Sequence, residues 1–228
     1  MKRLYGVIFL TFLCLFVKAE DIRERIVSLE AGLAYANFSL SVKDVGLKVD
    51  SDPRQGWHMG VGFVNLTWYN PHFAFGAEAD WGLTQKGGTM SFSGRKYGYD
   101  VTQHSVLKFL YTDIITNIVA MGRLAQWDDG SAFDLMAGCG GGLNYCVASS
   151  GELTVDNEKE QEKDILDDKD VLDFSLRLLA GFRYKTSQRA AIGLRYIYDH
   201  GIFSIKPAEN VKLKNRTSSI AVTLSFSF

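Results

Sequence analysis

The chain has 228 residues, which suits one domain or two small ones. Its 25 Lys and Arg residues nearly balance its 26 Asp and Glu residues, so a net charge of −1 excludes the strong basic field of a nucleic-acid-binding protein. No run of about 18 apolar residues follows residue 19, which excludes membrane-spanning helices from the rest of the chain.

The first residues have the anatomy of a secretory signal peptide. An apolar run from about Leu4 to Val17 follows two basic residues, and Val17 and Ala19 occupy the −3 and −1 positions of a cleavage site. The run is too short for a comfortable membrane span. We predict a signal peptide over residues 1–19 and an exported mature chain over residues 20–228.

Seven segments of the mature chain alternate between apolar side chains and small or polar ones. In chain order these segments are residues 26–35, 56–63, 73–84, 133–147, 172–185, 190–199 and 218–228. Because side chains of a strand point alternately to its two faces, period two predicts strands, whereas helices have a period of about 3.6 residues. The predicted fold class is therefore all-β.

One segment, residues 106–121, departs from this alternation. Its polar residues have the spacing of an amphipathic helix, and Ser105 is a plausible helix cap. We nevertheless predict a strand, irregular or bulged near Thr112 and Asp113, because the chain has to cross once between the long loops on either side. A closed barrel with both chain ends on one side also needs an even number of strands, and this segment makes eight.

The connections between the segments alternate in length. Short ones lie at residues 70–72, 126–131 and 186–189, and long polar ones span about 39–55, 85–104, 151–170 and 200–215. Short turns at one end and long loops at the other are typical of an antiparallel up-and-down transmembrane barrel. We therefore predict eight strands with short periplasmic turns and long extracellular loops.

The composition of the two strand faces favours lipid outside the barrel. A soluble barrel also alternates, but its water-facing surface is normally rich in Lys, Glu and Thr. Here the polar face is mostly Gly, Ala and Ser, which suits a narrow interior. The apolar face carries aromatic residues near the strand ends, as interfacial girdles do: Tyr35, Trp57, Trp81, Tyr145, Tyr184, Tyr198 and Phe228.

Charged residues on the polar face occur with both signs. Early strands supply Glu30, Glu78 and Asp80, and late strands supply Arg177, Arg183, Lys185 and Arg195. Buried charges persist only when they are paired or hydrated, so we predict a charge network across the lumen, with a structural or gating role.

The last strand resembles the C-terminal signature of bacterial outer-membrane barrels. Its alternating apolar residues and its terminal aromatic residue are Ile220, Val222, Leu224, Phe226 and Phe228. With the signal peptide, the mature chain resembles the small eight-stranded barrels of the OmpW, OmpX and OmpA type. The resemblance implies the outer membrane of a diderm bacterium, contact with its lipid, and recognition of the last strand by the barrel-assembly machinery.

The resemblance leaves two functions open. An OmpW-like barrel is a passive conduit for small, mainly hydrophobic molecules, with Trp57 and His58 near the mouth. An OmpX- or OmpA-like barrel is closed, and its surface loops bind host or surface ligands or support the envelope. Filling of a small barrel by side chains favours closure, whereas the many glycines favour some open volume, and we favour the conduit.

The sequence does not point to an enzyme, a cofactor or a metal site. Only His58 among the four histidines lies on a predicted strand, and its nearest hydroxyl residues in sequence are remote. The acidic segment 152–170 lacks the spacing of a calcium loop, so we expect a solvated, mobile loop. Cys139 and Cys146 have opposite strand parity and cannot form a disulfide with each other.

Overall fold

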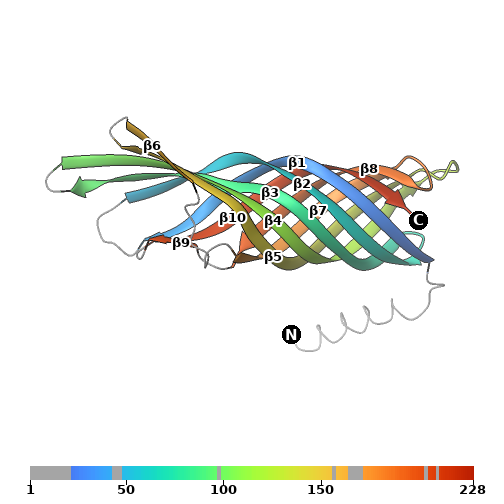
Figure 1. Ribbon diagram of the computed structural model, residues 1–228. Coiled ribbons are helices and arrows are strands. Elements are labelled where there is room, and N and C mark those ends of the chain that lie inside the picture. The colour runs from blue at the N-terminus through green and yellow to red at the C-terminus, as the bar shows by residue number, and fades with distance from the viewer. Residues whose placement is uncertain are drawn as a thin grey trace, which may run out of the picture.

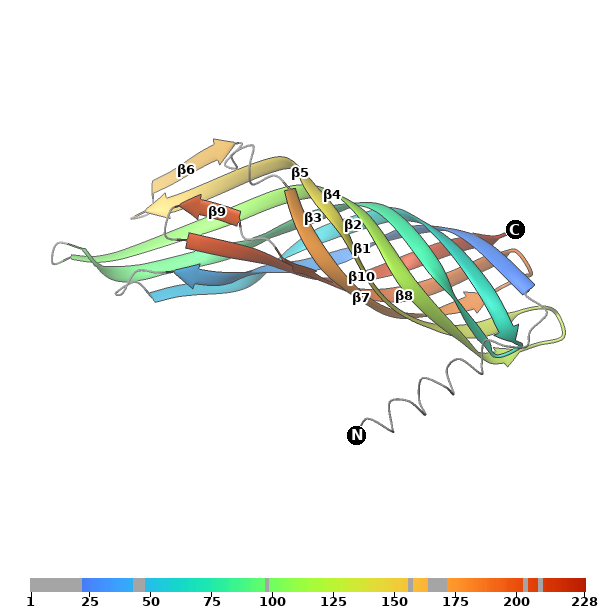
Figure 2. The same cartoon turned by 90° about the horizontal axis from the view of Figure 1, so that it is seen from below.

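Eight long antiparallel strands close into a ring (Figures 1 and 2). The computed structural model describes residues 22–42, 48–96, 99–155, 158–163, 172–202, 205–208 and 211–228. The ring strands are β1 (Ile22–Val42), β2 (Lys48–Asn70), β3 (Phe73–Lys96), β4 (Tyr99–Gln126), β5 (Ala132–Val155), β7 (Leu172–Lys185), β8 (Ala190–Gly201) and β10 (Val211–Ser227). The predicted eight-stranded barrel is confirmed, while the predicted signal peptide lies outside the described residues.

Pairing of the first strand with the last closes the barrel. The register runs from Ile26 opposite Ser227 to Val42 opposite Val211. All other ring neighbours are consecutive along the chain apart from two short strands, β6 (Glu158–Lys163) and β9 (Ile205–Ala208). β6 pairs with β5 and β9 pairs with β10, so both extend the wall at the loop end without joining the ring.

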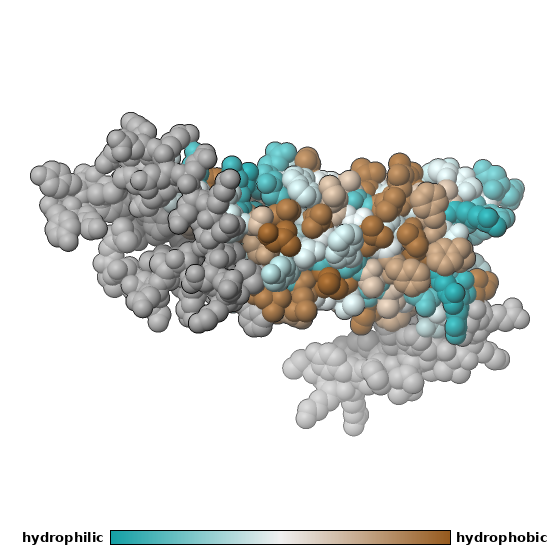
Figure 3. Space-filling view, viewed as in Figure 1, coloured by the Kyte–Doolittle hydropathy of each residue, from teal (hydrophilic) through white to brown (hydrophobic). Residues whose placement is uncertain are grey.

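The alternation of the sequence becomes an inner and an outer face. In β10, Ile220, Val222 and Leu224 are about half exposed, at 48%, 49% and 48%, whereas Ala221 and Thr223 between them are buried. Figure 3 shows apolar side chains gathered around the described barrel and hydrophilic ones at its short-turn end. Within the described ranges, no helix is long and apolar enough to cross a membrane.

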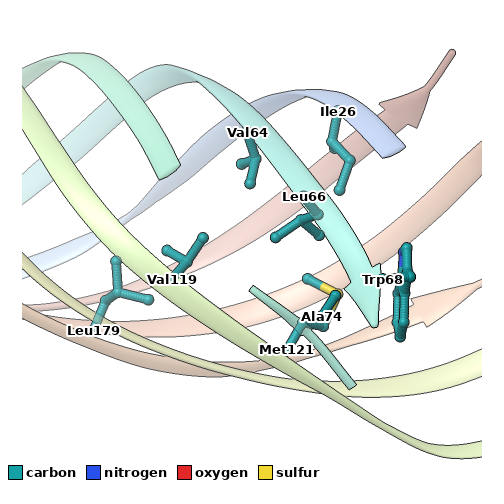
Figure 4. Packing of buried hydrophobic residues seen from close by; sticks show 8 residues of the cluster. All are labelled: Ile26, Val64, Leu66, Trp68, Ala74, Val119, Met121 and Leu179. Atoms are coloured by element: carbon teal, nitrogen blue, oxygen red, sulfur yellow. The ribbon is translucent and has the colours of Figure 1, made fainter. Parts of the chain in front are cut away.

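The segment with helical spacing is a strand, as predicted. β4 pairs with β3 without a break from Phe73 opposite Gly122 to Lys96 opposite Tyr99. Its inward positions carry apolar as well as polar side chains, which hides the period of two. Val119 and Met121 belong to an apolar cluster inside the short-turn half of the barrel (Figure 4), together with Ile26, Val64, Leu66, Trp68, Ala74 and Leu179.

The bulge predicted near Thr112 and Asp113 is present, but its extra residue lies on the neighbouring strand β5 and not on β4. The register between β4 and β5 shifts between Leu110 and Tyr111, which pair with Ala148 and Cys146. Val147 of β5 is therefore the extra residue. A bulge on a neighbouring strand leaves no trace in the local pattern of β4 itself.

The long connections were also predicted with too little structure. β3 and β4 continue to Lys96 and Tyr99, so the connection predicted over residues 85–104 is mostly a hairpin ladder. The acidic segment 152–170 contributes the end of β5 and all of β6, and residues 156–157 and 164–170 lie outside the described residues. Paired strands outside the membrane need no apolar face, so an alternating sequence pattern does not reveal them.

At Gly140, on the inner face of β5, the backbone of the neighbouring strand β4 approaches closely. A Cβ atom at Gly140 would collide with the carbonyl oxygen of Thr116 and would lie 2.5 Å from Asn117 Oδ1. The close backbone contact explains why glycine is required at this strand position.

We expect Gly140→Val to destabilise the folded barrel by about 1–3 kcal/mol, because the overpacked wall would have to shift. The midpoint of urea unfolding, followed by heat-modifiable gel mobility, measures the effect. Gly122→Val is the matched control, because a Cβ atom at Gly122 has no neighbour within 4 Å. Equal midpoints for the two variants would contradict the close approach at Gly140.

Candidate functional site

The centre of the lumen is crossed by a buried guanidinium group. Arg195, on β8, donates from Nη1 to Glu30 Oε2 at 3.0 Å and from Nη2 to Glu78 Oε2 at 2.7 Å. The Arg195 side chain is 3% exposed, and those of Glu30 and Glu78 are 2% and 0% exposed. One cation therefore ties β8 to β1 and β3, as the sequence predicted from the opposite signs of early and late strands.

A second guanidinium group lies beside the first. Arg177, on β7, forms a bidentate pair with Asp199, with distances of 2.7 and 2.9 Å. Its Nη1 also lies 3.4 Å from Asp80 Oδ2. Asn117 joins the two groups, because its amide donates to Glu78 at 3.1 Å and to Asp80 at 2.9 Å. We call the residues bonded around Arg177 and Arg195 the central network.

Towards the loops, the central network continues through His58. His58 Nε2 lies 2.8 Å from Glu30 Oε1, and Nδ1 lies 2.8 Å from Thr84 Oγ1. Thr84 in turn donates to Asp113, which also accepts from Lys86 at 3.2 Å. Thr84 Oγ1 therefore links the His58 ring to the buried pair of Asp113 and Lys86.

This arrangement corrects one expectation from the sequence. A hydroxyl group does lie beside His58, and Thr84, His58 and Glu30 have the order of a nucleophile, a base and an acid. The Thr84 proton, however, points to Asp113, and Thr84 is 0% exposed. The contact therefore joins β1, β2 and β3 inside the barrel.

An aromatic layer covers the central network on the loop side. Phe109 makes edge contacts with Phe38 and Tyr111, with ring centroids 5.7 and 6.2 Å apart. Lys86 lies 4.9 Å from the Tyr111 ring centroid, and Asn215 donates to the Tyr111 hydroxyl at 3.2 Å. All three rings are buried. These rings therefore fill part of the lumen on the loop side of the charges.

A separate set of ion pairs closes the short-turn end, and we call it the periplasmic network. Arg183 pairs with Asp134 at 2.8 Å and lies 3.4 Å from Glu24. Lys185 donates to Glu24 at 2.9 Å, and Arg123 to Asp134 at 2.9 Å. Arg183 is thus a lumen residue, as predicted, but it belongs to this network and not to the central one.

The sequence missed several partners in the two networks. Asp134 and Asp199 already stood on the polar face of alternating segments, so parity alone could have identified them. Lys86 was assigned to a loop and Asp113 to an irregular segment, which removed the parity argument for both. The missed charged residues that pair within the lumen are Glu24, Lys86, Asp113, Arg123, Asp134 and Asp199.

The two residues predicted to lie near the mouth are on opposite faces of the wall. His58 points inward and is 3% exposed. Trp57 pairs across the strands with Leu33, which is 47% exposed on the outer face. Trp57 therefore points outward with Leu33.

The predicted assembly signal forms one continuous outer stripe. Phe226 and Phe228 are 52% and 69% exposed, and they extend the stripe of Ile220, Val222 and Leu224 to the chain end. The Phe228 amide donates to the Arg25 carbonyl at 3.0 Å, and the Phe228 ring lies 6.4 Å from the Phe63 ring. The last residue is thus fixed on the membrane-facing side of the barrel.

Comparison with known protein families gives no match, and no curated protein matches the sequence. Several solved structures are similar. Ail of Yersinia pestis, in complex with the heparin analogue sucrose octasulfate, is 12% identical, with a TM-score of 0.36, over 87% of this chain and 98% of that chain. OprG from Pseudomonas aeruginosa is 12% identical, with a TM-score of 0.39, over 89% and 95% of the two chains.

The outer membrane protease OmpT from Escherichia coli is 9% identical, with a TM-score of 0.42, over 93% of this chain and 99% of that chain. What identifies the present chain is its own wall, with charges inside and an apolar, aromatic-edged surface outside. It is a small eight-stranded outer-membrane β-barrel.

Among the residues that the structure describes, no group of three or more His, Cys, Asp or Glu side chains could hold a metal ion.

Replacing Arg195 with Ala should destabilise the outer-membrane barrel by about 3–5 kcal/mol, because Glu30 and Glu78 would remain buried without their cation. Urea unfolding in lipid vesicles, followed by tryptophan fluorescence, measures this loss, and Arg177→Ala should behave similarly. Arg216→Ala is the control, because Arg216 is exposed at the loop end. Unchanged unfolding and unchanged ion leak in both lumen variants would show that the central network contributes nothing to closure.

Proposed function

We propose that this protein is a closed, non-enzymatic outer-membrane barrel that acts through its extracellular part, by binding a host or surface ligand or by supporting the envelope. The observation that carries the proposal is the filled lumen. The aromatic layer, the central network and the periplasmic network follow one another along the barrel axis, so buried side chains occupy the lumen at three successive levels.

The length of the hairpin of β3 and β4 supports a role outside the membrane. The two strands have 24 and 28 residues, whereas about 9–11 residues of a tilted strand cross a membrane. The surplus residues remain paired to the tip of the hairpin. A paired extension presents a fixed surface to a partner, and ordering it costs no entropy at the moment of binding.

A lateral conduit for small hydrophobic molecules is the second candidate, and the uneven height of the wall favours it. The pairing of β5 with β7 ends at Tyr145 opposite Leu172, and that of β10 with β8 ends at Arg216 opposite His200. β5 and β10 both continue beyond these points. Phe109 and Tyr111 lie inside the wall at this height, so an apolar solute that reached them among the loops would leave sideways over the ends of β7 and β8.

Flux and binding separate the two candidates. Purified protein in lipid vesicles should pass neither ions nor small aromatic solutes, and whole cells that display it should bind surface ligands more than cells without it. Phe109→Ala with Tyr111→Ala removes most of the aromatic layer, and we expect at most a small ion leak, because both charge networks remain. If the unmodified protein passed small aromatic solutes and the double substitution increased this flux several-fold, the result would favour the lateral conduit.

We also propose that the barrel-assembly machinery recognises the outer stripe that ends at Phe228. Deleting Phe228, or replacing it with Ser, should lower the amount of heat-modifiable barrel in the outer membrane several-fold, because both the aromatic ring and its contact with Phe63 are lost. Phe228→Tyr should restore normal amounts. Normal assembly of Phe228→Ser would contradict the proposed signal.

A further inference from the structure

A large cavity at the short-turn end lies outside the functions proposed above. Its volume is about 1090 Å³, and its lining includes residues from both faces of the wall. Glu24 and Trp68 belong to the inner face and are buried, whereas Phe226 and Phe228 lie on the outer face. The cavity therefore extends from the periplasmic mouth of the lumen across the end of the wall to the membrane side. We call it the periplasmic vestibule.

Positive charge exceeds negative charge in the lining of this vestibule. Four lining residues are basic, and Glu24 is the one acidic residue among the described lining residues. Glu24 is already shared by Lys185 and Arg183, at 2.9 and 3.4 Å. Glu24 is thus already paired within the periplasmic network. The remaining basic lining residues have no acidic partner among the described lining residues.

Arg23 and Arg189 are the uncompensated groups. Both side chains are exposed in the vestibule lining, and neither forms an ion pair within the described part of the chain. Arg123 lies between the lumen and this rim, where its guanidinium group is 4.2 Å from the Trp68 ring centroid while Nε donates to Asp134. Three guanidinium groups therefore line one cavity, and Arg groups bind phosphate oxygens in preference to most other acceptors.

The apolar part of the lining indicates which kind of anion fits the periplasmic vestibule. Phe226 and Phe228 end the membrane-facing stripe of β10, at the level where interfacial aromatic residues meet lipid head groups. A ligand that touches both these rings and the arginine groups has a charged end and an apolar end. We propose that the periplasmic vestibule binds an anionic phospholipid of the periplasmic leaflet, with its phosphate at Arg23 and Arg189 and its acyl chains along Phe226 and Phe228.

Native mass spectrometry of the purified full exported chain, with phosphatidylglycerol or phosphatidylcholine added in mild detergent, tests the proposal. The unmodified protein should retain phosphatidylglycerol preferentially. Arg23→Gln with Arg189→Gln should lower that affinity by about 30-fold, because each basic residue near an anionic lipid surface contributes about 1 kcal/mol to the binding free energy. Both arginines lack ion pairs in the described chain, so the double variant should keep the heat-modifiable mobility of the folded barrel.

Arg54→Gln with Arg216→Gln is the matched control, because it removes the same charge from the loop end of β2 and β10. Retention in this control should equal that of the unmodified protein. Equal retention of the two lipids, or an equal loss in both double variants, would overturn the vestibule site. Binding of soluble glycerol phosphate with the affinity of phosphatidylglycerol would also overturn it as a lipid site, because the acyl chains would then contribute nothing.

Discussion

Arg195 reaches across the lumen and holds Glu30 of β1 and Glu78 of β3 with one guanidinium group. Charges in so narrow a space have no bulk water, and each costs several kcal/mol unless a partner of opposite sign compensates it. The remaining design of the interior follows from this constraint. Small residues at neighbouring inner positions leave room for the long side chains, and Asn117 supplies the donors that two adjacent carboxylates need.

The closed wall and the filled interior support each other. Pairing of β1 with β10 leaves no strand edge in the membrane-spanning ring, so the wall exposes no open row of backbone donors and acceptors to lipid. Several ion pairs also join strands that are not neighbours in the ring, such as β8 with β3 through Arg195. A barrel held by both kinds of contact resists flattening as well as opening, and the apolar cluster in the short-turn half adds to the packing of the interior.

The sequence predicted the wall much better than the site. Residues such as Ile220 and Val222 must face lipid, and this strict requirement imposes the period of two that identifies a strand. The interior imposes no such rule, because Val119 and Asp113 both point inward on β4. Charge signs predicted that partners would meet, but the choice of Asp199 for Arg177, and of Asp134 for Arg183, depends on strand stagger, which the local pattern does not encode. The extended hairpins were missed for a related reason, since strands in water need no apolar face.

The unbroken ladder between β3 and β4 has a mechanical consequence. Its pairs run without a register shift from Phe73 and Gly122, at the short turns, to Lys96 and Tyr99, far beyond the membrane. A pull along the strand direction on the extended hairpin would put β3 and β4 under tension together, and the backbone hydrogen bonds that resist in shear would be those to β2 and β5. Tension applied outside the cell would therefore pass along both strands to Glu78 and Asn117 in the lumen, so the extension acts as a stiff tether.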